Sequence, residues 1–339
     1  MPLQKILFKS GVNRENTRYT SEGGWYECDK IRFRQGNPEV IGGWQRISAN
    51  TYQGVCRSLW NWITLSFQNL LGVGTNLKFY IEKGAAYYDI TPIRLNRTGG
   101  SALTDPFVAT LGSSIVTVTD VNNGSVTGDF VTFSNATGLG GNITDVILNQ
   151  EFQLTVTGVD TYTIDVGVAA TSADVLGSPG GGTVDAAYQL NVGPAIQIPL
   201  TGWGAGGWGV GTWGYGGTSL SSIRLWSQSN FGENLVFGPR GGGIYYWDAA
   251  GGVVTRGVNA KDLPGASDVP EVQNFILVSD ASRFVFAFGA DDYGSIGVQD
   301  PMLIRWSEQE SVTQWTPAAT NQAGSLRLSH GSEIVTAIQ

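Results

Sequence analysis

Few residues in this sequence have a type and spacing suited to catalysis. His330 is the only histidine, so any Ser-His-Asp or Cys-His arrangement would have to include it, and a metal site built from several histidines is excluded. Its neighbours Ser329, Gly331 and Ser332 are typical of a turn between strands. We therefore expect no catalytic role for His330.

Pairs of carboxylates are the next possibility, because a glycosidase needs two acids roughly 5 to 10 Å apart. The candidate pairs are Asp291 with Asp292, Glu27 with Asp29, and Glu308 with Glu310. The two members of each pair are adjacent or nearly so, in expected turns or strand ends, where carboxylates ordinarily lie in solvent. We expect all of them to be solvated surface groups, and we predict that the protein is not an enzyme.

Motifs for cofactors and metals are equally sparse. Gly202, Gly204 and Gly207 formally satisfy G-x-G-x-x-G, but no strand precedes them and no helix follows to present a pyrophosphate. Cys28 and Cys56 form neither a disulfide framework nor a C-x-x-C pair, so we expect free, buried thiols. The sequence predicts no cofactor and no metal site.

Composition narrows the class of protein. Glycine accounts for 48 of the 339 residues, about twice the usual share, which favours many tight turns over helices. Only 14% of residues are charged and the net charge is −8, so a basic face that grips phosphate backbones is not expected. The start lacks the pattern of a secretory signal, and no run of 18 apolar residues occurs, so we expect synthesis in a cytoplasm and no stable membrane association.

Strand patterns dominate the chain, and they predict an all-β fold. Three segments repeat an apolar strand, a glycine-containing turn and a second strand rich in aromatic residues. The predicted strand pairs are 77–81 with 85–90, 235–237 with 244–247, and 283–288 with 302–306. Because RLWSQ at 224–228 and RWSEQ at 305–309 also echo one another, we interpret the segments as β-propeller-like blades, with an array of sandwiches as the alternative.

A change in composition marks an insertion at 101–188, where tryptophan is absent. Phe152, Leu154 and Val156 alternate with polar residues, as strands do when one face is buried and the other is wet. We predict a first propeller-like segment at 1–100, a small inserted β-sandwich or barrel at 101–188, and a second propeller-like segment at 189–339.

The second segment contains a glycine- and tryptophan-rich loop at 202–217. Trp203, Trp208 and Trp213 recur every five residues, a period that fits neither strand nor helix. Rings in such a loop can pack on their own domain, anchor a contact between subunits, or stack on a sugar. These three residues are the candidate subunit-interface or surface-binding residues.

The N-terminal segment predicts two strands, 30–34 and 39–47, joined by a turn at 35–38. It contains in succession Glu22-Gly23-Gly24-Trp25, Lys30-Ile31-Arg32-Phe33-Arg34 and Gly42-Gly43-Trp44. This succession resembles the start of tail hub or nozzle proteins of short-tailed bacteriophages, some of which are described as packaged-DNA stabilisation proteins. Residues 201–204 and 231–235 are similar to later parts of the same proteins.

The resemblance implies a structural virion protein, located in the tail and made in the host bacterial cytoplasm. Its copies would form a homo-oligomeric, hexameric ring of β-propeller protomers beneath the portal and adaptor proteins, near tail fibres or spikes. The ring would be a conduit and plug for genome retention and ejection, with double-stranded DNA passing transiently and without sequence preference. A receptor- or carbohydrate-binding tail module is the alternative, and a polysaccharide-degrading enzyme is a third possibility.

The number of blades raises a separate question. About three and a half blades are visible, whereas four or more close a propeller, and the last residues read as part of a strand. Two explanations stay open: the chain is truncated, or further strands come from elsewhere.

Overall fold

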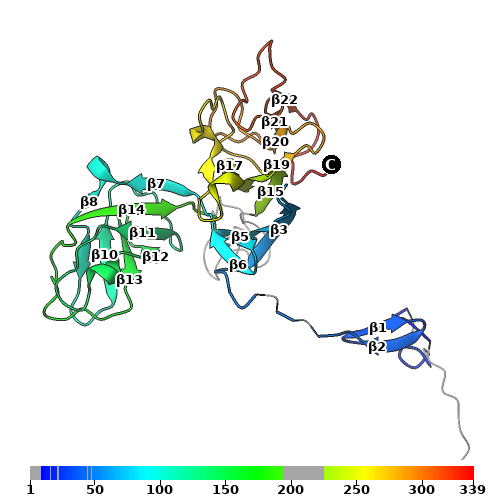
Figure 1. Ribbon diagram of the computed structural model, residues 1–339, viewed down its shortest axis with the longest axis horizontal. Coiled ribbons are helices and arrows are strands. Elements are labelled where there is room, and N and C mark those ends of the chain that lie inside the picture. The colour runs from blue at the N-terminus through cyan, green and yellow to red at the C-terminus, as the bar shows by residue number, and fades with distance from the viewer. Residues whose placement is uncertain (1–8, 16, 21–22, 44, 47, 194–224) are drawn as a thin grey trace, which may run out of the picture. The chain divides into compact units, whose positions relative to one another are not determined.

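The computed structural model describes residues 9–15, 17–20, 23–43, 45–46, 48–193 and 225–339 (Figure 1). The chain divides into two compact units, 1–49 and 50–339. Residues 1–49 thus form a unit by themselves within the predicted first segment at 1–100.

The first unit contains one antiparallel hairpin, β1 (Ile31–Arg34) and β2 (Asn37–Val40). Gln35 and Gly36 both have positive φ, at 50° and 84°, as the two central residues of a type I′ turn require. The predicted hairpin is confirmed, but its turn is shorter and its second strand ends at Val40. Trp44 lies outside the described residues.

The second unit contains three four-stranded antiparallel sheets in which each strand pairs with the next along the chain. The first blade is β3 (Cys56–Ile63), β4 (Asn69–Thr75), β5 (Phe79–Lys83) and β6 (Ala86–Asp89). The second blade is β15 (Trp226–Phe231), β16 (Asn234–Pro239), β17 (Tyr245–Trp247) and β18 (Val258–Asn259). The third blade is β19 (Phe275–Val278), β20 (Val285–Phe288), β21 (Leu303–Trp306) and β22 (Gly324–Arg327). All three predicted strand pairs fall within these blades, and the predicted all-β class is confirmed.

The blades meet along their first strands. The Gln228 amide nitrogen on β15 donates to Ser58 Oγ on β3, at 3.0 Å. The backbone N–H of Ile276 on β19 donates to Ser227 Oγ on β15, at 3.1 Å. β3, β15 and β19 therefore succeed one another side by side, which is the arrangement of the innermost strands of a propeller.

Aromatic rings fill the space between the first and second blades. Phe79 stacks on Phe237 with ring centroids 4.3 Å apart and meets Trp226 edge-on at 4.9 Å. Trp62 and Trp247 close the same cluster. The second and third blades meet through a mainly aliphatic cluster that includes the fully buried Trp315. Each interface between two neighbouring blades is thus a hydrophobic core.

The close approach of the first two blades requires a glycine at position 74. A Cβ atom there would lie 2.6 Å from Trp226 Cδ1 and 2.5 Å from Ser58 Oγ. We expect Gly74→Ala to lower the free energy of unfolding by about 1 to 3 kcal/mol, because overpacking forces neighbours out of place. Urea denaturation followed by tryptophan fluorescence checks this. Gly100→Ala, whose Cβ would meet nothing within 4 Å, is the control and should leave the midpoint unchanged.

The inserted part of the chain forms an eight-stranded antiparallel sheet with the order β7-β14-β11-β12-β13-β10-β9, in which β8 also pairs with β14. Its strands are β7 (Ile93–Arg97), β8 (Leu103–Thr104), β9 (Phe107–Ala109), β10 (Ile115–Thr119), β11 (Phe130–Ser134), β12 (Glu151–Val156), β13 (Thr161–Asp165) and β14 (Thr183–Gln189). Its helical turns are η1 (Gly99–Ser101) and α1 (Asp145–Leu148), and the second blade carries η2 (Ala249–Gly251) and η3 (Ala260–Asp262). The sheet begins at Ile93, before the predicted boundary at 101.

The alternation predicted for this sheet is confirmed. Phe152 and Leu154 on β12, and Tyr162 and Ile164 on β13, have at most 6% of their surface exposed. The hydroxyl groups of Tyr162 and Tyr188 lie 2.8 Å apart, and Tyr188 donates to Asp120 at 2.7 Å. The sheet therefore encloses a hydrophobic core around one chain of buried hydrogen bonds.

Candidate functional site

A pocket of about 800 Å³ lies where the turns of the first and second blades meet. The β3–β4 turn, the β15–β16 turn and the start of η2 line it. Its charged lining residues are Lys83, Glu233, Asp248 and Arg283, and its aromatic ones are Phe231 and Trp247. A pocket with both signs of charge and a partly apolar wall suits a polar organic ligand.

The two acids of this pocket have structural partners. Glu233 lies in the two-residue turn between β15 and β16, where Gly232 has a φ of 65°. Its carboxylate accepts the N–H of Leu65 at 2.6 Å, and its carbonyl accepts the indole N–H of Trp62 at 2.9 Å. The Asp248 carboxylate accepts the N–H of Ala250 and caps η2. Glu233 and Asp248 thus stabilise turns through hydrogen bonds.

Replacing Glu233 with alanine should loosen the β3–β4 turn. Because a charge-assisted hydrogen bond to the Leu65 N–H is lost, we expect the free energy of local opening to fall by about 1.5 kcal/mol. Hydrogen exchange of the Leu65 amide measures this. Asp248→Ala is the control, since its carboxylate bonds Ala250 instead, and equal exchange at Leu65 in both variants would contradict the assignment.

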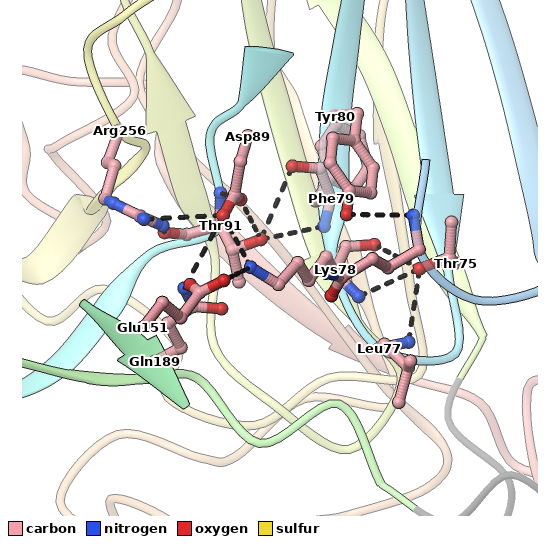
Figure 2. A network of polar contacts seen from close by, with 11 residues as sticks. Thr75, Leu77, Lys78, Phe79, Tyr80, Asp89, Thr91, Glu151, Gln189 and Arg256 are labelled. Atoms are coloured by element: carbon pink, nitrogen blue, oxygen red, sulfur yellow. Dashed lines mark hydrogen bonds and ion pairs between the residues drawn. The ribbon is translucent and has the colours of Figure 1, made fainter. Parts of the chain in front are cut away.

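A buried polar cluster joins the first blade to the inserted sheet (Figure 2). Lys78, whose side chain is only 3% exposed, lies 3.0 Å from the Asp89 carboxylate and 2.6 Å from that of Glu151 on β12. Its ammonium group also lies 4.6 Å from the centre of the Phe130 ring. Gln189 on β14 donates to Glu151, and Arg256 pairs with Asp89 at 3.3 Å. One buried cation therefore connects acids from two sheets.

The charges of this cluster set the pKa of Asp89. Burial raises that pKa, but Arg256, Lys78 and two hydrogen bonds from Thr91 outweigh burial and hold it below its ordinary value. Burial also raises the pKa of the neighbouring Tyr80 to about 12. Asp89 therefore stays ionised at neutral pH and the Tyr80 hydroxyl stays protonated, as a fixed junction requires. The cluster is suited to positioning the inserted sheet.

Some of the residues predicted from the sequence lie outside the described residues, and the structure places the others. The candidate interface tryptophans Trp203, Trp208 and Trp213 and the glycines Gly202, Gly204 and Gly207 lie outside the described residues. His330 is exposed, in a bend, and its Nδ1 lies 2.8 Å from Ser329 Oγ. Cys28 and Cys56 are free but half-buried, so the prediction of buried thiols is wrong.

Four of the paired carboxylates are exposed as predicted: Glu27, Asp29, Asp292 and Glu310. Glu308 is half-buried and accepts the N–H of Gln322. The prediction is wrong for Asp291, which is only 1% exposed. Its carboxylate accepts the N–H groups of Glu271 and Gly297, because the chain folds back over it.

Sequence reasoning also missed Arg305, which is 1% exposed. It donates to the carbonyls of Asp291 and Asp268, at 3.1 and 2.5 Å, and its guanidinium lies 3.9 Å from the Tyr293 ring centre. The alternation of β21 carried a signal, because residue 305 falls on the same sheet face as the buried Leu303. Within the described ranges, no group of three or more His, Cys, Asp or Glu side chains could hold a metal ion, and no helix is long and apolar enough to cross a bilayer.

Comparison with known proteins finds a likeness among solved structures. No family model and no curated protein matches the sequence. Among solved structures, the chain is similar to the Phage phi92 endosialidase, with a TM-score of 0.25, 14% sequence identity, and coverage of 81% of this chain and 36% of that one. The chain thus spans about a third of the length of that protein.

Proposed function

We propose that this chain is a structural subunit of a bacteriophage tail nozzle or hub. In this role, copies of the chain form a homo-oligomeric ring, hexameric as the resemblance implies, below the portal and adaptor and beside fibres or spikes. The ring retains the packaged genome and conducts it during ejection. The N-terminal motifs described above support the assignment to this class.

One observation carries the structural part of this role. Three blades stand side by side through β3, β15 and β19, and the row ends in a sheet face with partly exposed apolar side chains at each end. Apolar sheet faces of this kind are normally covered by another layer. A protein built in this way is suited to assembly with further β-sheets.

The charge of the chain suits contact with passing DNA. The net charge of −8 disfavours adhesion to phosphates, because a lumen lined by carboxylates repels the backbone of the genome. A conduit needs a wall along which the genome slides. This supports passage of DNA without sequence-specific binding.

The location of the protein in virions tests the proposal. We expect an antibody raised against the protein to label the tail end of intact particles in electron micrographs. An amber mutation in its gene should give particles that package DNA and then lose it. Particles of full infectivity that lack the protein would refute the proposal.

A further inference from the structure

The pocket of about 800 Å³ between the blade turns is lined by two cations that the fold itself does not use. Lys83 is the last residue of β5 in the first blade, and Arg283 lies in the turn between β19 and β20 of the third. Lys83 is half-buried and Arg283 is exposed. Neither side chain pairs with a carboxylate among the described residues. Both are therefore available to a ligand that carries negative charge.

The acids of the pocket keep part of their hydrogen-bonding capacity. Glu233 accepts the Leu65 N–H with Oε1, and Asp248 accepts the Ala250 N–H with Oδ1. The second oxygen of each carboxylate accepts no hydrogen bond from the part of the chain that the structure describes. A carboxylate oxygen readily accepts from a hydroxyl group. The pocket thus offers two acceptors on two separate turns, in addition to its two cations.

The remaining wall of the pocket is apolar. Phe231 is half-buried at the end of β15, and Ile63 and Leu65 of the first blade are 61% and 86% exposed. Such a wall suits the C–H groups of a ligand that is polar elsewhere.

Hydrogen bonds fix the walls without any ligand. In the β3–β4 turn, the N–H of Thr64 donates to the Gln68 carbonyl at 3.0 Å. At the start of η2, the side-chain oxygen of Asn234 accepts the N–H of Ala249 at 2.9 Å. A ligand would bind without first ordering these turns, which favours affinity.

We infer that this pocket binds an acidic sugar, that is, a sugar residue with a carboxylate. Lys83 and Arg283 hold the carboxylate, Glu233 and Asp248 accept hydrogen bonds from ring hydroxyls, and the C–H groups of the ring pack on Phe231. A sugar acid combines these three kinds of group on one ring.

Other classes of ligand fit fewer of these groups. A plain anion such as phosphate would have to approach two carboxylates without donating to them. A neutral sugar would cover two cations without pairing them, which costs binding energy. A cationic peptide would meet Lys83 and Arg283 as like charges. The combination of both signs of charge with an apolar wall therefore favours the acidic sugar.

An array of oligosaccharides tests the inference, with each acidic glycan printed beside its carboxyl-reduced form. In the reduced form a primary alcohol replaces the carboxylate and the rest of the molecule is the same. We expect the labelled full chain to bind one or more acidic glycans and to bind their reduced forms at least about tenfold more weakly, because charge-assisted hydrogen bonds are lost. No binding to any acidic glycan, or equal binding to both forms, would overturn the inference.

Calorimetric titration with the acidic glycan that binds best assigns the site. We expect Lys83→Met and Arg283→Gln each to raise the dissociation constant at least about tenfold, with little change in urea midpoint, since neither side chain has an ion-pair partner in the described ranges. Lys83→Arg keeps the charge and should bind within a few-fold of the parent, which separates loss of charge from loss of fold.

Arg327→Gln is the matched control for these variants. Arg327 is a 64% exposed cation of the third blade that does not line the pocket, so its replacement should leave the dissociation constant unchanged. Pocket variants that bind like the parent, or a control that weakens binding as they do, would place the sugar elsewhere and overturn the assignment. The site does not depend on the proposed function, and a chain that binds acidic glycans but is absent from tails would contradict the proposed function alone.

Discussion

Replacing Arg305 with methionine is expected to lower the free energy of unfolding by about 3 to 5 kcal/mol. The guanidinium is buried between Asp291 and Asp268, with nitrogen-to-oxygen distances of 3.9 and 3.8 Å to their carboxylates. Methionine fills much of the same volume but leaves the Asp291 carboxylate without its counter-charge, at a site where that residue is 1% exposed. Urea denaturation followed by the fluorescence of the nearby tryptophans measures the loss.

Arg327→Met is the matched control for this variant. Arg327 lies in the same blade and pairs with Asp300 at 2.6 Å, but its side chain is 64% exposed. Because water screens an exposed pair, we expect a loss of at most about 1 kcal/mol. Similar losses in the two variants would show that burial of Arg305 does not determine its contribution.

Replacing Lys78 with methionine is expected to have an effect of similar size, about 3 to 5 kcal/mol, at the junction between the first blade and the inserted sheet. Asp89 and Glu151 both bond the same ammonium group, so its removal leaves two partly buried carboxylates facing one another. Lys261→Met is the control, because Lys261 pairs with Glu271 at 2.9 Å but is 40% exposed. Equal urea midpoints for the two variants would contradict the prediction.

Lys78→Met should also change how the free energy of unfolding depends on pH. In the parent protein the pKa of Asp89 in the folded state is below its ordinary value. Asp89 therefore stabilises the fold at pH values above its pKa in the unfolded chain, and this stability is lost as the pH falls through its pKa in the folded protein. Without Lys78 that pKa rises toward its ordinary value, so less stability remains to be lost. We expect a flatter dependence of the urea midpoint on pH below neutrality. An unchanged slope would show that Arg256 and Thr91 alone lower the pKa.

The blades could be predicted because their strands carry a local signal. Residues 235–237 and 244–247 combine apolar alternation with a glycine-rich turn, and the structure pairs Leu235 with Trp247. The inserted sheet was harder to delimit, because β7 pairs with β14 across a long stretch of sequence. No local pattern shows that Ile93–Arg97 belongs to a strand at 183–189, so the predicted boundary fell after β7.

The buried charges could not be predicted with the same success. Asp291 and Asp292 are adjacent, and both were predicted to be exposed, yet Asp291 is buried and Asp292 is exposed. The difference arises because Arg305, from a strand that follows a long loop, reaches back to Asp291. Lys78 follows a turn and resembles any surface lysine in the sequence. Only the fold brings Asp89 and, from the inserted sheet, Glu151 to its ammonium group.

The pairing of β7 with β14 also has a consequence for how such a chain can change over evolution. Leu95 and Tyr188 are cross-strand partners, so the polypeptide enters and leaves the eight-stranded sheet at neighbouring positions. The whole sheet is therefore a cassette with two adjacent junctions, and a short turn or a different module spliced in there would leave the ends of the host fold where they are. A replacement without an acid at the place of Glu151 would leave Lys78 paired with Asp89 alone. The contact with Lys78 is thus one that a replacement module must reproduce in order to keep the present junction.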